Sequence, residues 1–211
     1  MLTAIKDEKL REGVFYDSSK FQMKNYVEKW KEKVLNADGK LAKFGELNSV
    51  ISNDTKKWFI RPNSDGKEFS GKVDTFGNLK KWSDKVCKLD LIELNKETLI
   101  WISEPKEIDK EWRIFIVGNE IISACRYMVL GKLDECENDI PEEMIKFTED
   151  RIGEYQIEDI YVMDIAQVGK DYKIIECNCF NGTGFYKHDI ESVIKSVNKL
   201  IKGKIKRKTC G

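Results

Sequence analysis

The chain has 211 residues, a size compatible with one or two domains and a substantial core. Its 37 basic residues equal its 37 acidic residues, so charge does not indicate a nucleic-acid or membrane partner, although it leaves nucleic acid open. No apolar run reaches the ~20 residues of a membrane span, and the N-terminus lacks the apolar centre of a signal peptide. We therefore expect a cytoplasmic protein with reduced cysteines.

The first part of the chain predicts a helix, two strands and a second helix, in that order. Apolar residues at helical spacing predict a helix over residues 23–34, which Asp17–Ser19 can cap. Strand-forming residues follow at Trp58–Arg61 and Phe69–Val73. A second apolar stripe predicts a helix over residues 79–89.

A polar, glycine-containing loop, Asn63–Gly71, follows the first predicted strand and overlaps the start of the second. Arg61 ends the strand before it, and Lys67 lies in its middle. Such a loop can close over a phosphate with lysine as a mobile point charge, so we predict a mobile lid. The spacing is not that of a Walker motif, and an ordinary surface loop explains the pattern equally well.

A strand at Leu99–Ser103 precedes a predicted hairpin over residues 111–126, with Gly118-Asn119 as its two-residue turn. An uninterrupted ladder would pair Val117 with Glu120, Phe115 with Ile122, Arg113 with Ala124 and Glu111 with Arg126. Glu111, Arg113 and Arg126 would then share one face of the sheet. A simple ion pair between Glu111 and Arg126 would explain them, as would a guanidinium cluster that binds phosphate oxygens.

The most informative segment is a second predicted hairpin, Tyr161–Phe180, in which Gly169-Lys170-Asp171 supplies the turn. A three-residue loop places Asp164 opposite Glu176, and alternation puts Asn178 on the same face. A two-residue loop would instead put Asp164 on the other face. Two carboxylates and an amide oxygen suit Mg²⁺, although a solvated hairpin edge with incidental charges is the alternative. The cysteines Cys177 and Cys179 should face the opposite side.

Helices are also predicted after Pro141 and over residues 190–201, where Asp189 can cap the second one. The tail Lys202–Lys208 is basic and reads as a solvated helix end. Helices and strands are interspersed without regular alternation, which predicts an α+β fold with largely antiparallel sheets.

The order of short motifs along residues 55–190 resembles the ATP-grasp superfamily. The motifs are Arg-Pro-x-Ser-Asp-x-Lys-x-Phe-x-Gly, Ile-Ser-Glu-Pro, Glu-Trp-Arg, Ser-x-x-Arg-Tyr, Val-x-Asp and Glu-x-Asn-x-Phe-Asn-Gly-x-Gly-Phe-Tyr. The resemblance is to the divergent clade named for two arginines and one lysine, which includes a eukaryotic cell-division-cycle factor that assembles a translation initiation complex. It implies two α+β subdomains that enclose ATP.

The resemblance also implies roles for individual residues. Asp164, Glu176 and Asn178 look like the Mg²⁺ ligands. Arg61 and Lys67 look like contacts to the nucleotide phosphates, with Lys67 also in the catalytic set. The remaining carried-over residues are Ile102, Ser103 and Glu104 for adenine, Glu111 for the ribose, and Arg113 and Arg126 at the transferred phosphate.

The expected organisation is a short helical segment at residues 1–55, an N-terminal subdomain at 56–98 and a C-terminal subdomain at 99–211. Most ATP-grasp enzymes carry a larger N-terminal domain that helps to bind the acceptor. Here either the acceptor is a macromolecule with its own surface, or the chain is a shortened form.

The function implied is an ATP- and Mg²⁺-dependent ligase that joins a carboxylate to an amine or similar nucleophile through an acyl phosphate. The acceptor, a protein, peptide or small molecule, is unidentified, and the analogy favours a protein or peptide. The alternatives are a nucleotide-binding assembly factor without ligase activity and a nucleic-acid end-joining or modifying enzyme.

Overall fold

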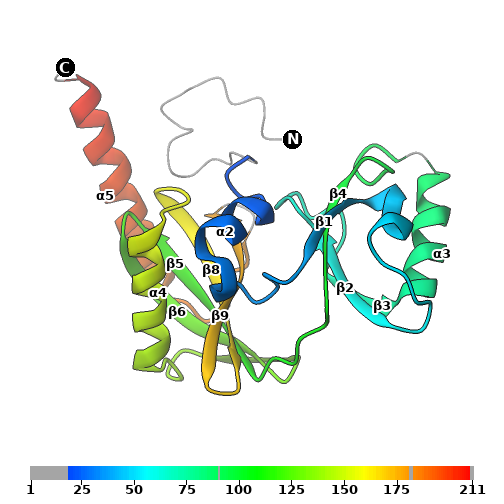
Figure 1. Cartoon of the computed structure of the whole chain (residues 1–211). Helices are drawn as coiled ribbons and strands as arrows, with labels where there is room; N and C mark the ends of the chain where they lie inside the picture. The colour runs from blue at the N-terminus through cyan, green and yellow to red at the C-terminus, as the bar shows by residue number, and fades with distance from the viewer. Residues whose placement is uncertain (1–18, 90, 181–182, 210–211) are drawn as a thin grey trace.

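The computed structural model describes residues 19–89, 91–180 and 183–209, and two antiparallel sheets organise it (Figure 1). The four-stranded sheet has the order β1-β4-β2-β3, and the five-stranded sheet has the order β7-β6-β5-β8-β9. Helices and 3-10 turns cover both sheets, so the predicted α+β class is confirmed.

The four-stranded sheet forms the smaller lobe. It contains β1 (Lys40–Lys43), β2 (Lys57–Pro62), β3 (Lys72–Thr75) and β4 (Leu99–Ser103). The helix α3 (Phe76–Cys87) and the 3-10 turn η2 (Phe44–Ser49) cover it. Phe44, Ile60, Leu79 and Ile100 are buried completely between them. The subdomain boundaries at 55/56 and 98/99 stay a prediction. The sheet includes β1, which precedes the first boundary, and β4, which follows the second.

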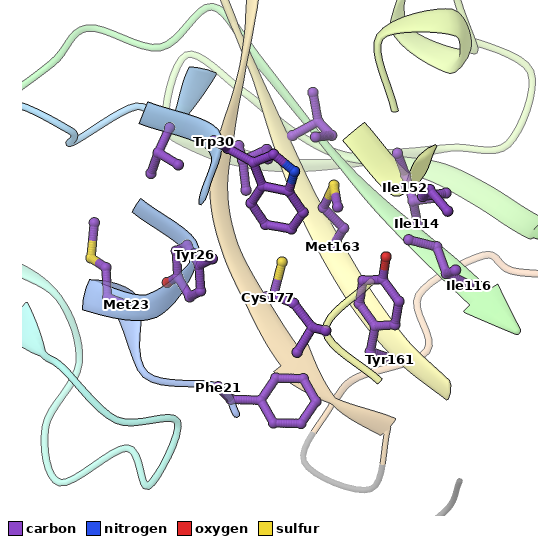
Figure 2. Packing of buried hydrophobic residues seen from close by; sticks show 14 of the residues in the cluster. Phe21, Met23, Tyr26, Trp30, Ile114, Ile116, Ile152, Tyr161, Met163 and Cys177 are labelled. Atoms are coloured by element: carbon purple, nitrogen blue, oxygen red, sulfur yellow. The ribbon is translucent and has the colours of Figure 1, made fainter. Parts of the chain in front are cut away.

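The five-stranded sheet forms the larger lobe. Its strands are β5 (Lys110–Val117), β6 (Glu120–Val129), β7 (Lys132–Cys136), β8 (Ile160–Val168) and β9 (Asp171–Cys179). On one face it packs against α2 (Met23–Trp30), the 3-10 turn η1 (Lys31–Lys33) and α4 (Glu142–Glu154). Figure 2 shows Tyr26 and Trp30 of α2 against Met163 and Cys177 of the hairpin. Cys177 and Cys179 face this core, as predicted.

The other face of the five-stranded sheet is divided between an apolar end and a charged end. The helix α5 (Ile190–Thr209) packs Val193 and Val197 against Phe115 and Val162 at the apolar end. Since alternate residues share a face, Glu111 and Arg113 continue the row of Phe115 along β5. Asp164 likewise continues the row of Val162, so the charges lie where α5 leaves the sheet uncovered.

The four predicted helices are present, but their caps differ in part. Gln22 occupies the N-cap position of α2, and the predicted cap residues 17 and 18 lie outside the described residues. Asp189 caps α5 as predicted, because its Oδ1 accepts a hydrogen bond from the Ser192 amide at 3.0 Å. Within the described residues, no helix is both long enough and apolar enough to cross a membrane. The five cysteines in those residues are free thiols.

His188, two residues before α5, gives a prediction for pH dependence. It is 8% exposed, its Nδ1 lies 2.8 Å from Ser123 Oγ, and its ring meets Phe115 edge-on. Burial, aided by the charge of Arg113, lowers the pKa of His188 to about 4. A folded pKa below the unfolded value of about 6.5 stabilises the protein fully above that pH, and the stabilisation is lost as the pH falls towards 4.

We expect His188→Gln to remove this component, which amounts to about 3 kcal/mol at most. Urea denaturation at pH 7 and pH 4.5 measures it as the extra loss of unfolding free energy in the wild-type protein. The same pH dependence in both proteins would show that His188 titrates normally in the folded state.

Candidate functional site

The β8–β9 hairpin brings two carboxylates to one face, as predicted, but with a different turn and register from those predicted. Val168 pairs with Asp171, so the turn is Gly169-Lys170, and Gly169 has a positive φ of 60° that suits glycine. Asp164 nevertheless pairs with Glu176, because the ladder shifts at Ile175, where β9 carries one extra residue. This β-bulge restores the face that the shorter turn would have reversed. The predicted pairing is confirmed, and the three-residue loop was wrong.

Asp164 forms a buried, two-pronged ion pair with Arg113 of β5. Arg113 Nε donates to Asp164 Oδ1 at 2.9 Å, and Nη2 donates to Oδ2 at 2.7 Å. Only 2% of Asp164 and 8% of Arg113 are exposed. Burial raises the pKa of Asp164, while the hydrogen bonds and charge of Arg113 oppose that rise. The guanidinium therefore compensates a carboxylate that would otherwise be buried alone.

Glu176 forms the second ion pair, and this one connects the two sheets. Arg61 of β2 places Nη2 2.7 Å from Glu176 Oε2, and Asn178 Nδ2 donates to Oε1 at 3.0 Å. Burial raises the pKa of Glu176, but the charge of Arg61 and the hydrogen bond from Asn178 outweigh it, so the pKa is lowered overall. Glu176 therefore stays ionised at the junction of the lobes.

A cleft of about 400 Å³ opens above this junction. Arg61 and Lys67 line it from the smaller lobe, and Glu111, Tyr127, Glu176 and Asn178 line it from the larger one. Tyr127 Oη donates to Glu111 Oε2 at 2.7 Å. Burial raises the pKa of Glu111, and this hydrogen bond opposes the rise. The cleft thus combines cationic and acidic groups within reach of one small ligand.

The loop over residues 63–71 is anchored at its start. The buried Asn63 accepts a hydrogen bond from the Met23 amide at 2.7 Å through its carbonyl oxygen. Asp65 Oδ2 accepts one from the Cys179 amide, at the end of β9, at 2.9 Å. Lys67 and Ser70 lie further along the loop, and Lys67 has a left-handed φ of 54°. The anchored part of the loop therefore bridges both lobes, and the later part flanks the cleft.

We accordingly expect hydrogen exchange to divide this loop. The Asn63 amide should exchange slowly with or without nucleotide, because it donates to the Leu99 carbonyl at 2.9 Å in the part of the loop that is tied to both lobes. Residues 66–71 should become protected when Mg-ATP is added at saturating concentration. Exchange measured by mass spectrometry on peptides that end on either side of residue 66 distinguishes the two parts. Identical exchange at 66–71 in both states would remove Lys67 from the proposed site.

Arg126 lies on the opposite face of the sheet from Arg113, which corrects the predicted hairpin register. The pairing of Val117 with Glu120 is confirmed, but β6 carries an extra residue at Ile122, so Phe115 pairs with Ser123 and Arg113 with Cys125. Arg126 consequently pairs with Trp112.

On that face Arg126 forms ion pairs with Asp134 and Asp139, and Lys110 also contacts Asp139. The guanidinium of Arg126 is therefore engaged at the β6–β7 hairpin, and the expected pair of arginines in one cleft is not formed. Tyr127, the next residue, faces Glu111 in its place.

The residues expected at adenine lie at the end of β4. Its backbone pairs with β1 on one side and β2 on the other, and Ile102 and Ser103 are buried. Ser103 Oγ donates to Asn36 Oδ1 at 3.1 Å, and the exposed Glu104 forms an ion pair with Lys56 at 2.6 Å. The structure therefore gives the first two residues structural partners, and only Glu104 lies beyond the paired strand.

The donor set at the hairpin fits a hard divalent cation. Asp164, Glu176 and Asn178 offer carboxylate and amide oxygens, which Mg²⁺ prefers. Within the described residues there is no cluster of three acidic, histidine or cysteine side chains that could hold a metal, so the amide oxygen of Asn178 would have to complete the set. Arg113 and Arg61 balance the two carboxylates, and a bound cation would compete with both.

Comparison with known proteins identifies the family. Residues 11–197 match the model of an ATP-grasp domain, family 3 of the clade named for two arginines and one lysine. The chain belongs to the ATP-grasp family. No curated protein matches its sequence.

Solved structures share the ATP-grasp fold at low sequence identity. D-alanine–D-alanine ligase from Bacillus anthracis is 11% identical with a TM-score of 0.57, and the match covers 88% of this chain and 69% of that one. A RimK-domain ATP-grasp protein from Sphaerobacter thermophilus is 9% identical with a TM-score of 0.59, and the match covers 86% of this chain and 66% of that one. The ATP-grasp ligase PsnB, complexed with a minimal precursor, is 12% identical with a TM-score of 0.52, and the match covers 84% of this chain and 60% of that one. These matches show the fold.

Proposed function

We propose that this ATP-grasp chain is a Mg²⁺-dependent ligase that joins a carboxylate to an amine or similar nucleophile and releases ADP and phosphate. The observation that carries the proposal is the facing pair of carboxylates Asp164 and Glu176, each balanced by an arginine from a different strand, with Glu176 lining the cleft. Related structures support the ligand class, since the B. anthracis ligase is complexed with ATP and PsnB with Mg and ADP.

The arginines and carboxylates suggest an exchange of partners when nucleotide binds. Asp164, Glu176 and Asn178 would hold Mg²⁺, which neutralises charge on the phosphates when bound. Arg61, which lines the cleft, would then be free to donate to phosphate oxygens together with Lys67. Arg113 would contact the transferred phosphoryl group and Glu111 the ribose. The end of β4 at Glu104, the one residue of the three beyond the paired strand, would contact the adenine.

In the proposed reaction the donor carboxylate attacks the γ-phosphate and releases ADP, and the nucleophile then displaces phosphate from the acyl phosphate. The chain contributes fixed charge around the transferred group, and residues 66–71 would exclude water that hydrolyses the acyl phosphate. We propose a protein or peptide acceptor, which the complex of PsnB with its precursor supports by analogy.

The products released from ATP distinguish the functional classes. The purified chain is incubated with Mg²⁺, ATP and pools of peptides, and nucleotide products are separated by ion-exchange chromatography. ADP and phosphate that depend on the acceptor support the ligase. AMP and pyrophosphate would contradict it, and tight ATP binding without turnover on any acceptor would favour an assembly factor.

A further inference from the structure

Two tyrosines from distant parts of the chain stack on each other and both contact the guanidinium of Arg113. Tyr127 of β6 and Tyr186, which precedes α5, stack with ring centroids 4.8 Å apart and planes 5° apart. The Cζ atom of Arg113 lies 5.5 Å from the centroid of the first ring and 5.0 Å from the second. Both distances are within the range of a cation–π interaction.

A further hydrogen bond holds the Tyr127 ring in place, and the backbone around Tyr186 is constrained. Tyr127 is 6% exposed and donates its hydroxyl to Glu111. Tyr186 has a positive φ of 39°, which is unfavourable for a residue with a Cβ and must be offset by its surroundings. Two residues before it, the carbonyl of Gly184 accepts a hydrogen bond from Arg113 Nη1 at 3.2 Å. The segment before α5 therefore closes over Arg113 through a ring and a carbonyl.

We propose that Tyr127 and Tyr186 are positioning residues that hold Arg113 while it exchanges partners. The proposal rests on the proposed function, in which a metal ion takes Asp164 and Arg113 serves the transferred phosphate. An ion pair with Asp164 weakens when the carboxylate binds a cation, whereas the two aromatic faces keep their attraction for the guanidinium. The rings would thus fix the plane of the Arg113 guanidinium, and with it the direction of its N–H donors, throughout the reaction.

This role predicts that losing a ring weakens binding of the γ-phosphate and changes binding of the rest of the nucleotide little. Calorimetry in the presence of Mg²⁺ gives the dissociation constants of ADP and of a non-hydrolysable ATP analogue, and their ratio isolates the γ-phosphate. We expect Tyr186→Ala to reduce the preference for the analogue on the order of tenfold, since the loosened guanidinium no longer meets the γ-phosphate in a fixed orientation. Tyr186→Phe keeps the ring and should keep the preference.

Tyr127→Phe separates the hydroxyl from the ring. It removes the hydrogen bond to Glu111 but keeps the face next to Arg113, so both nucleotides should weaken equally and the ratio should stay the same. A ratio that falls as far as in Tyr186→Ala would overturn the role assigned to the rings.

Tyr155→Ala is the matched control, because Tyr155 packs edge-on against Trp30 in the other core at 5.5 Å. It should lower thermal stability without changing the ratio. If Tyr186→Ala does not fold, Tyr186→Leu keeps apolar volume without the aromatic face and should show the reduced ratio. Unchanged ratios in Tyr186→Ala and Tyr186→Leu would overturn the inference, whereas a wild-type protein that binds neither nucleotide would contradict the proposed function itself.

Discussion

Replacing Glu176 by glutamine is expected to weaken Mg-ATP binding on the order of 10- to 100-fold while the melting temperature changes little. Glutamine keeps the volume and an oxygen for Arg61, but it removes the charge that a divalent cation requires. The side chain is 25% exposed and lies at the cleft, so the fold does not depend on its burial. Calorimetric titration with ATP in excess Mg²⁺, paired with thermal denaturation, measures both quantities.

Glu158→Gln provides a matched control. The Glu158 side chain is 18% exposed and lies 2.6 Å from Lys20, compared with 25% and 2.7 Å for Glu176 and Arg61, but it lies outside the cleft. We expect its substitution to leave Mg-ATP affinity unchanged. A collapse of thermal stability in Glu176→Gln, with affinity preserved, would instead identify Glu176 as a structural group that links the lobes.

Replacing Arg113 by methionine is expected to destabilise the folded state by about 3–5 kcal/mol, the usual cost of leaving a buried charge without its partner. Asp164 is 2% exposed and receives two hydrogen bonds from Arg113. Methionine fills much of the same volume, so the loss is chiefly that of compensating charge. Urea denaturation at pH 7, followed by tryptophan fluorescence, gives the free energy of unfolding.

Arg151→Met controls for the loss of a buried arginine. Both arginines are 8% exposed, but Arg151 pairs with Glu154, whose side chain is 50% exposed and remains solvated when the arginine is removed. Its substitution should cost about 1 kcal/mol or less from the ion pair. Equal losses in the two variants would mean that Asp164 tolerates the absence of Arg113, and the account of their pairing would be wrong.

The two hairpins show how far periodicity alone predicts a site. In both, apolar runs on either side of a glycine-containing turn indicated the strands, alternation assigned the faces, and the turns were located to within one residue. The facing of each charge depended on β-bulges that the amino-acid pattern does not mark. In β9 the extra residue Ile175 compensated for a shorter turn, so Asp164 and Glu176 met as predicted. In β6 the extra residue Ile122 was not compensated before Arg126, which turned that side chain to the other face.

Contacts between distant segments were outside the reach of local patterns. The short strands β1 and β7 were missed because each has four or five residues, most of them charged or exposed. The loop after β2 has the composition of a mobile turn, yet Asp65 anchors it to the amide of Cys179. Tyr127 and Tyr186 were present in the quoted motifs, but only the folded chain brings their rings together over Arg113. Sequence predicted the residue types of the site better than their partners.

In the proposed function, Asp164, Glu176 and Asn178 bind a divalent cation together with ATP. Crystals grown with Mn²⁺ and a non-hydrolysable ATP analogue, measured at a wavelength where manganese scatters anomalously, locate the metal directly. We predict a single strong peak within about 2.0–2.3 Å of oxygen atoms of these residues, bridged to the phosphates, with Arg61 turned from Glu176 to a phosphate oxygen. Nucleotide bound in the cleft with its metal elsewhere, and both arginines still paired with the two carboxylates, would contradict it.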